Sequence, residues 1–345
     1  MRLMGRSLGG TERGVNGHQP VNLSDNVRLT RTLAMLLPGS DKVPLSWLRF
    51  GEPRAPMAER TAALCTPPLE QLPFTDPSGS SEIATMIVGN RQTKGALPVA
   101  SEHFDAALFT HRGRGYARYN EDGAGLFRDE RGHLYAAVFD QAGGLGGDIR
   151  GQASALAAEK ALKSFRKIAT GRPGQDIAKA LAEGLSEAHD ALVERRQGEV
   201  TTAVVAVAQE DTIILATSGD SAAIHLSAEG RPLDETVKHE HSTPYGVSAL
   251  THAVGLTPEG PNTQIASWRL DPGQWVIMCS DGLLDSGLPP EAWGEILSTA
   301  ESAEAGVNTL AGRVLKRMTL LQAKPDNLTI VAFRRRSVRD STEEK

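Results

Sequence analysis

Residues 275–285 read Trp-Val-Ile-Met-Cys-Ser-Asp-Gly-Leu-Leu-Asp. The first five residues predict a buried strand, because a short continuous apolar run bounded by turn residues is typical of one. Asp281 follows this strand almost directly. Asp140 and Asp326 also lie at the ends of apolar runs. The repeated pattern predicts several carboxylates at the edges of a sheet.

Apolar runs and the turn residues between them define the expected elements. Strands are predicted at 104–110, 134–139, 202–208, 212–216, 222–226, 275–279 and 328–333, and amphipathic helices at 157–168 and 177–192. Two helices within a set of mostly antiparallel strands favour an α+β fold of stacked sheets covered by helices over a repeating βαβ fold. Residues 237–262 lack clear strands and are predicted to form a long surface flap.

Four aspartates are candidate ligands: Asp122 in Asn120-Glu-Asp122, and Asp140, Asp281 and Asp326, which sit directly at predicted strand edges. Each alone is also typical of ordinary turn chemistry beside Gly or Asn. Gathered at one rim, their carboxylates would repel unless cations neutralised them, and hard oxygen ligands favour Mg²⁺ or Mn²⁺. Two such ions about 4 Å apart can activate water for attack on a phosphate ester without a covalent enzyme intermediate. Further carboxylates that could orient the water shell are Glu121 and Asp285.

Seven motifs resemble those of the type 2C (PPM-type) metal-dependent serine/threonine protein phosphatases. They are Asn120-Glu-Asp122, Val138-Phe-Asp140 with Gly143-Gly144, Thr201-Thr-Ala-Val204, Ser218-Gly-Asp-Ser221, Leu250-Thr-His-Ala-Val-Gly255, Cys279-Ser-Asp-Gly-Leu-Leu-Asp285 and Asp326-Asn-Leu-Thr329. One such motif is a weak signal, whereas seven in family order across residues 103–335 form a specific one.

The resemblance implies a four-layer α-β-β-α sandwich of two mostly antiparallel sheets flanked by helices. It implies an enzyme that hydrolyses phosphoserine or phosphothreonine on proteins and opposes a cognate serine/threonine kinase. The implied cofactors are two Mg²⁺ or Mn²⁺ ions and a weaker third. The implied ligands are Asp122, Asp140, the backbone carbonyl of Gln141, Asp281 and Asp326, with Asp285 at the third ion.

Three positions depart from the family pattern. The family usually places an Arg five residues before the first metal-binding Asp, where it would hold the substrate phosphate, and here that residue is Ala117. Candidate substitutes are Arg112, Arg114 and Arg118. Gln141 and Val200 replace glycines, and a β-carbon at residue 141 would cost energy if its backbone needed positive φ. The departures motivate a second hypothesis, a catalytically weak or inactive phosphatase-fold module that binds phosphoproteins or a regulatory partner.

Three other motifs carry competing interpretations. The run Gly143-Gly-Leu-Gly-Gly147 lacks the spacing of a dinucleotide loop, and the sequence contains no Gly-Lys-Ser/Thr phosphate loop. His239-Glu-His241 lacks the further ligands of a zinc site and is interpreted as part of the flap. Ser218-Gly-Asp-Ser221 lacks a Gly-x-Ser-x-Gly elbow and predicts a tight hairpin turn between two strands.

Composition limits the partners. The formal net charge of −5 argues against a nucleic-acid partner, for which a basic surface is expected. No apolar run approaches the roughly 18 residues needed to cross a bilayer, so we expect no membrane contact. Two cysteines are too few for a disulfide framework, which favours a cytoplasmic location. We also expect a monomer. The Pro- and Gly-rich residues 1–100 predict a mostly disordered extension, followed by the phosphatase domain at 101–336 and a charged tail at 337–345.

Overall fold

The computed structural model describes residues 74–75, 81–88, 91–114, 119–142, 151–171, 176–195, 198–242 and 248–336. The chain divides into two units, Met1–Cys65 and Thr66–Lys345, and every described residue belongs to the second. Most of the predicted N-terminal extension and the whole predicted tail lie outside the described residues.

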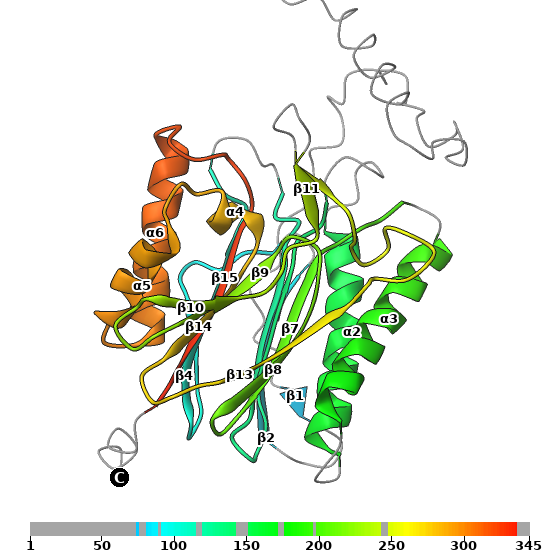
Figure 1. Ribbon diagram of the computed structural model, residues 1–345, viewed down its shortest axis with the longest axis horizontal. Coiled ribbons are helices and arrows are strands. Elements are labelled where there is room, and N and C mark those ends of the chain that lie inside the picture. The colour runs from blue at the N-terminus through cyan, green and yellow to red at the C-terminus, as the bar shows by residue number, and fades with distance from the viewer. Residues whose placement is uncertain are drawn as a thin grey trace, which may run out of the picture. The chain divides into compact units, whose positions relative to one another are not determined.

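Two stacked antiparallel sheets form the centre of the fold (Figure 1). The seven-stranded sheet has the order β1 (Phe74–Thr75), β2 (Ser81–Ile87), β5 (Gly123–Arg128), β6 (Leu134–Phe139), β7 (Ala203–Gln209), β8 (Thr212–Ser218) and β13 (Gln264–Arg269). The six-stranded sheet has the order β10 (Pro232–Glu235), β9 (Ala222–Leu226), β14 (Trp275–Cys279), β15 (Leu328–Arg335), β4 (Phe104–His111) and β3 (Leu97–Ala100).

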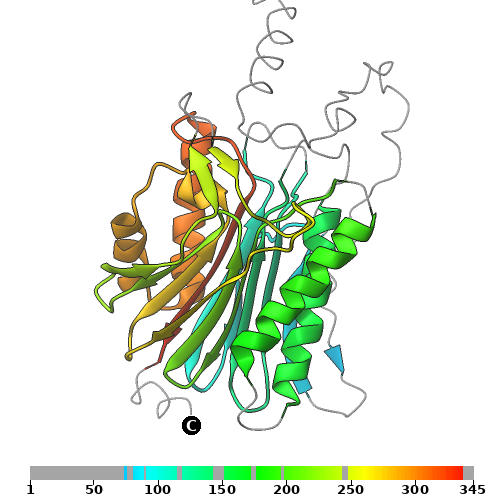
Figure 2. The ribbon, with the colours of Figure 1, turned by 45° about the vertical axis from the view of Figure 1, so that its right-hand side comes forward.

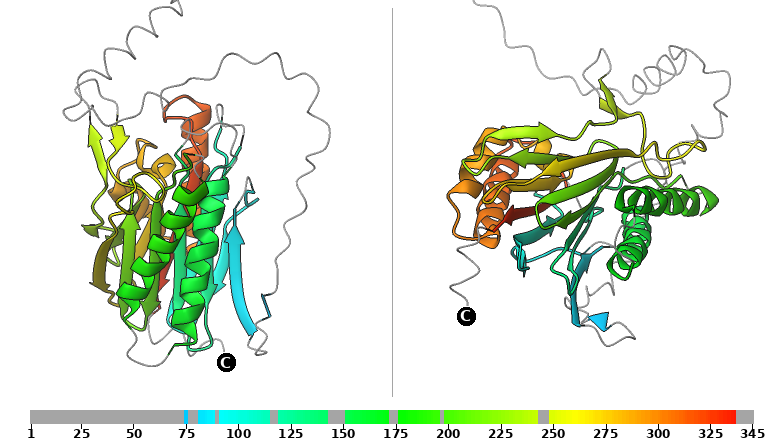
Figure 3. Two further views of the ribbon diagram at one scale, coloured as in Figure 1. Left: turned by 90° about the vertical axis from the view of Figure 1, so that its right-hand side faces the viewer. Right: turned by 60° about the horizontal axis from the view of Figure 1, so that its bottom comes forward.

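Helices cover the outer face of each sheet. The helices α2 (Gln152–Ala169) and α3 (Ile177–Arg195) run side by side over the seven-stranded sheet, and α5 (Pro290–Ser298) and α6 (Ala303–Thr319) pack on the six-stranded one (Figure 3). Residues such as Phe104, Leu126 and Phe333 fill the space between the sheets and are at most 1% exposed. The predicted α-β-β-α sandwich is confirmed.

The first two long strands precede the predicted domain boundary at residues 100/101. β2 pairs with β5 from Ile83↔Arg128 to Ile87↔Ala124, and β3 pairs with β4. Residues 83–87 lie within the segment predicted to be a mostly disordered extension, and their pairing with β5 shows a strand. The sandwich therefore includes strands that lie before residue 101.

The predicted flap contains more structure than its sequence indicates. Within residues 237–262, β11 (Glu240–Ser242) and β12 (Ser248–Leu250) form a separate two-stranded antiparallel ribbon (Figure 2). The expectation that this region lacks strands is wrong, because strands of three residues are too short to show the alternating pattern by which a strand is predicted. None of the described helices is long and apolar enough to cross a membrane.

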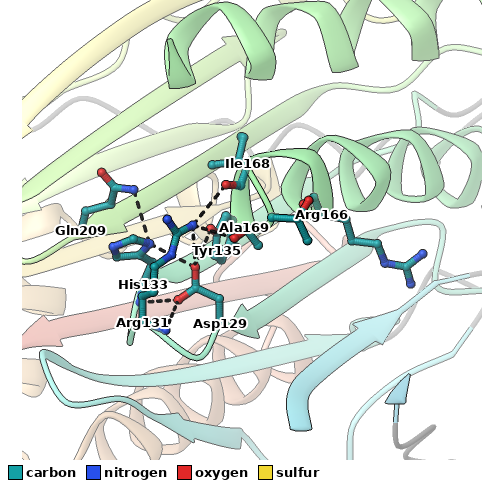
Figure 4. A network of polar contacts seen from close by, with 9 residues as sticks. Asp129, Arg131, His133, Tyr135, Arg166, Ile168, Ala169 and Gln209 are labelled. Atoms are coloured by element: carbon teal, nitrogen blue, oxygen red, sulfur yellow. Dashed lines mark hydrogen bonds and ion pairs between the residues drawn. The ribbon is translucent and has the colours of Figure 1, made fainter. Parts of the chain in front are cut away.

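A polar network closes the β5–β6 hairpin (Figure 4). Oδ1 of Asp129 accepts the backbone N–H groups of Arg131 at 3.0 Å and His133 at 2.9 Å, and its Oδ2 accepts the Tyr135 hydroxyl at 2.9 Å. Burial alone would raise the pKa of Asp129, but the hydrogen bonds and charge of His133 and the hydrogen bond of Tyr135 hold it below its usual value. The turn is thereby locked in one conformation.

The same turn is tied to α2. Nη2 of Arg131 donates to the carbonyl oxygens of Ala169 at 2.7 Å and Ile168 at 3.2 Å, at the C-terminal end of the helix (Figure 4). These bonds satisfy carbonyls that a helix end leaves without intrahelical partners. They fix the far end of the β5–β6 pair, whose opposite end carries two of the candidate site residues.

Candidate metal centre

Strand register brings four aspartates to one edge of the sandwich. The pairing Gly123↔Phe139 places Asp122, just before β5, beside Asp140, just after β6. In the other sheet β14 ends and β15 begins at the same edge, which places Asp281 and Asp326 together. The edge location predicted from the sequence follows from these registers.

Asp122 joins the two sheets. It is fully buried, and its Oδ2 accepts hydrogen bonds from Ser280 Oγ at 2.9 Å and Thr329 Oγ1 at 2.7 Å. Both hydroxyl groups come from the six-stranded sheet and its edge, whereas Asp122 begins a strand of the seven-stranded sheet. This carboxylate therefore has a fixed position across the interface.

A hydrogen-bond chain supports Asp122 from behind. Because the Thr329 hydroxyl donates to Asp122, the 2.7 Å contact between Thr110 Oγ1 and Thr329 Oγ1 requires Thr110 to be the donor. Asn120 Nδ2 in turn donates to Thr110 Oγ1 at 2.9 Å. The chain orients every hydroxyl toward the carboxylate.

A glycine allows the two halves of the centre to approach. A β-carbon on Gly282, which follows Asp281 in the short helix α4 (Asp281–Leu284), would overlap the carbonyl oxygen of Asn327. Only glycine permits this contact. The Ser-Asp-Gly sequence therefore places Asp281 against the segment that carries Asp326.

The carboxylates perturb one another. Although Asp140 retains some exposure to solvent, burial and then the charges of Asp122, Asp281 and Asp326 raise its pKa well above the usual value. Burial raises the pKa of Asp122 further than the hydrogen bonds of Thr329 and Ser280 lower it. Burial and the charge of Asp326 also raise the pKa of Asp281. A cluster of this kind favours the binding of positive charge.

A fifth aspartate belongs to the cluster. Burial and then the charge of Asp281 raise the pKa of Asp220 to about 6. Its loop was predicted to be a hairpin turn between 212–216 and 222–226, and that prediction is wrong, because β8 and β9 belong to different sheets. The loop instead crosses between the sheets, and the backbone N–H of Gly219 donates to Nδ1 of His239 in the flap at 3.1 Å.

Lys324 lies among three carboxylates of the centre. Its Nζ is 2.8 Å from Asp326 Oδ2, 3.0 Å from Asp281 Oδ2 and 3.4 Å from Asp285 Oδ2. Burial alone would lower the pKa of Lys324, but the hydrogen bond to Asp326 and the charges of Asp281 and Asp326 raise it. Among the described residues, no group of three or more His, Cys, Asp or Glu side chains is arranged as a ready metal site.

The side chains nevertheless fit divalent cations by their chemistry. Oδ1 of Asp122 is buried and has no hydrogen-bond partner, and a buried carboxylate oxygen without a partner is costly. Carboxylate oxygens are the ligands that Mg²⁺ and Mn²⁺ prefer. An ion bound at Oδ1 would satisfy this atom.

Gln141 has a structural role that the family pattern does not explain. Its side chain is 5% exposed, and its Oε1 accepts the backbone N–H of Ala153 at 2.9 Å, in the first turn of α2. It is not among the described non-glycine residues with positive φ, so the β-carbon imposes no strain there. Its replacement of glycine therefore stabilises the start of a helix.

The remaining predicted residues are distributed unevenly. The backbone N–H of Glu121 donates to Asn327 Oδ1 at 2.8 Å, which holds this residue beside Asp326. Arg114 is exposed and lines a pocket of about 570 Å³ beside the C-terminal half of α6. Arg118, Ala117 and the glycine run 143–147 lie outside the described residues.

Sequence reasoning missed several residues of the centre, namely Ser280, Thr329, Asp220 and Lys324. The first three lie inside the quoted motifs, so their position beside the predicted aspartates was a usable signal. Lys324 is separated from Asp281 by 43 residues, and only the folded chain brings the two together.

Comparisons with known proteins agree with this fold. The PppA protein, titled "a key regulatory component of T6SS in Pseudomonas aeruginosa", has 22% identity and a TM-score of 0.55, with coverage of 69% of this chain and 100% of that one. The Mycobacterium tuberculosis serine/threonine phosphatase PstP/Ppp has 19% identity and a TM-score of 0.55, with coverage of 68% and 100%. Serine/threonine phosphatase Stp1 from Staphylococcus aureus has 20% identity and a TM-score of 0.57, with coverage of 71% and 98%.

These likenesses show a shared fold, that of the bacterial type 2C serine/threonine phosphatases, as the sequence motifs predicted. No curated protein matches the sequence. The sequence model of Stage II sporulation protein E (SpoIIE) matches residues 131–336, which is more than half of the chain. The chain therefore belongs to the SpoIIE family of type 2C-like phosphatase domains.

Proposed function

We propose that this protein hydrolyses phosphoserine and phosphothreonine on proteins with two Mg²⁺ or Mn²⁺ ions. The proposed ligands are Asp122, Asp140, the backbone carbonyl of Gln141, Asp281 and Asp326. The observation that carries the proposal is Oδ1 of Asp122, a buried carboxylate oxygen without a hydrogen-bond partner among mutually repelling aspartates. The shared fold with serine/threonine phosphatases supports it.

Hydrogen bonds within the chain position the proposed metal ligands. Ser280 and Thr329 both donate to Oδ2 of Asp122, so Oδ1 is left for a cation. The backbone carbonyl of Asp140 accepts from Thr202 N at 2.7 Å and Thr201 Oγ1 at 3.0 Å, which fixes the backbone that leads into Gln141. When bound, the ions lower the pKa of water and stabilise negative charge on the phosphoryl group.

Other polar residues would serve the substrate and its water. Glu121 and Asp285 are proposed to orient water near the ions, and Asp220 adds a carboxylate whose pKa is raised by the charge of Asp281. Arg114 and Arg118 are proposed to bind the substrate phosphate in place of the missing family Arg, because a guanidinium matches phosphate oxygens with two parallel hydrogen bonds. The proposed partners are phosphoproteins and a cognate serine/threonine kinase. The protein itself is proposed to be a cytoplasmic monomer.

A second candidate function is a phosphatase-fold module that binds phosphoproteins or a regulatory partner with little or no turnover. The contacts of Lys324 favour it, because an ammonium group already neutralises part of the carboxylate cluster. It differs from the first in predicting phosphopeptide binding without phosphate release.

Phosphate release from a phosphothreonine peptide separates the two. We expect release with Mn²⁺ or Mg²⁺, none with chelator, and a loss of at least about 100-fold in Asp140→Asn, because that change removes a ligand the ions need. The matched control is Asp190→Asn, which alters an exposed aspartate on α3. A folded wild-type protein that binds the peptide without metal-dependent release would establish the second function instead.

A further inference from the structure

We propose that Lys324 is an internal cation of the carboxylate cluster, which holds Asp281 and Asp326 together in the metal-free protein and must be displaced when a divalent ion binds. The inference rests on the proposed metal centre and adds a competitor to it. The Lys324 side chain would therefore lower the affinity of the centre for divalent ions. The protein would alternate between one form in which the ammonium contacts the carboxylates and another in which metal ions do.

The geometry of Lys324 differs from that of an ordinary surface ion pair. Its Nζ lies within 3.0 Å of carboxylate oxygens from both Asp281 and Asp326, and within 3.4 Å of Asp285. Every other lysine that forms an ion pair among the described residues contacts a single carboxylate, as Lys163, Lys167, Lys179 and Lys238 do. One ammonium shared by three carboxylates is a cation-binding arrangement.

The backbone around Lys324 is held on both sides. Upstream, Nη2 of Arg317 donates to the carbonyl of Gln322 at 3.0 Å, and Nε of Arg317 donates to the backbone carbonyl of Ser286 at 2.8 Å. Downstream, Asn327 Nδ2 donates to the carbonyls of Tyr119 at 2.8 Å and Arg112 at 3.1 Å. The segment that presents the lysine is therefore positioned by its surroundings.

Backbone strain lies in the same segment. Leu321 has a φ of 58° and is 82% exposed. A bulky residue rarely adopts this conformation, and here the helix end imposes it. The Gln322 N–H donates to the Arg317 carbonyl at 2.9 Å and the Leu321 N–H donates to the Met318 carbonyl at 3.1 Å, the two hydrogen bonds of a Schellman motif. The end of α6 therefore fixes the direction in which the chain leaves the helix, three residues before Lys324.

Displacement of the ammonium is feasible. The Lys324 side chain is 53% exposed, and its ammonium group lies at the end of a flexible aliphatic chain. The ammonium can therefore move into solvent when an ion binds. A dication next to the ammonium would be repelled, and at such short range the repulsion lowers affinity by roughly tenfold even in a high-dielectric surrounding. Divalent binding is therefore opposed by the lysine and not assisted by it.

The test is calorimetric titration of Mn²⁺ into the chelator-treated and dialysed full-length protein, together with melting in excess chelator. The variants are Lys324→Gln and Lys324→Met, which remove the charge, and Lys324→Arg, which keeps it. The matched control is Lys163→Gln, whose lysine is 50% exposed and makes a 2.8 Å bond to one carboxylate.

We expect both neutral variants to bind Mn²⁺ about tenfold more tightly and to melt about 3–6 °C lower in chelator. Lys324→Arg and Lys163→Gln should resemble the wild type in both measurements. Equal or weaker binding by the neutral variants, with a wild type that binds Mn²⁺, would overturn the inference and leave the metal centre standing. Failure of the wild type and both neutral variants to bind Mn²⁺ would overturn the metal centre and the inference together.

Discussion

Replacement of Thr329 by valine tests how firmly the two sheets are joined at the site. The hydroxyl of this fully buried residue donates to Asp122 at 2.7 Å and accepts from Thr110 at 2.7 Å. Valine keeps the shape of the side chain and removes both bonds. Oδ2 of Asp122 would then keep one donor, Ser280, in place of two.

The expected cost follows from the two bonds. A hydrogen bond to a charged group contributes about 1.5–3 kcal/mol, and the Thr110 hydroxyl would lose its acceptor at a cost of about 1 kcal/mol. We therefore expect the free energy of unfolding to fall by about 3 kcal/mol. In a domain of this size that corresponds to a melting temperature about 6–12 °C lower.

The assay is guanidinium unfolding in excess chelator at pH 8. The matched control is Thr309→Val, because Thr309 donates to the Ala305 carbonyl at 2.9 Å on the exposed face of α6. Thr329→Ser should restore most of the lost stability, since it returns the hydroxyl. A loss no greater than that of Thr309→Val would refute the proposed role of this chain of hydroxyl groups.

Three further predictions concern single elements. Asp281→Asn should abolish most Mn²⁺-dependent turnover while leaving the protein folded, because it removes a metal ligand; near-normal turnover at limiting Mn²⁺ would contradict this. Asp129 has a lowered pKa in the folded state, so its contribution is complete above about pH 4 and is lost as the pH falls through the folded value. Asp129→Asn should therefore flatten the decline of unfolding free energy below pH 4, and an unchanged slope would exclude the network of Figure 4 as its source. A chain that starts at residue 98 lacks β2, which pairs with β5, and should melt well below one that starts at residue 70; equal melting temperatures would make that strand dispensable.

Much of the sandwich could be predicted from continuous apolar runs. Strands such as β6 and β14 are buried at every position, and their sequences contain few polar interruptions. β5 was missed because Gly-Ala-Gly-Leu-Phe-Arg is rich in small residues with little strand preference. Local pattern also cannot tell whether consecutive strands pair with each other. The sequence therefore predicts a hairpin of β8 and β9, although the two strands belong to different sheets.

Some residues of the candidate site could likewise be predicted from the sequence, and others could not. Asp140 and Asp281 could be predicted because each follows a strand, and strand ends gather at the edge of a sheet. The contacts of Lys324 could not, because they depend on how the segment after α6 returns to the edge of the sheet. The helix-capping role of Gln141 was hidden for the same reason, since its partner lies 12 residues away in a helix whose start the sequence did not mark.

Crystals grown with Mn²⁺ offer the most direct test of the metal centre, because anomalous scattering locates manganese independently of any assumed chemistry. We predict two anomalous peaks about 4 Å apart, one of them within coordination distance of Asp122 Oδ1 and both bounded by Asp140, Asp281 and Asp326. Well-ordered carboxylates without manganese beside them, in crystals of protein that still releases phosphate from a phosphothreonine peptide, would contradict the proposed centre.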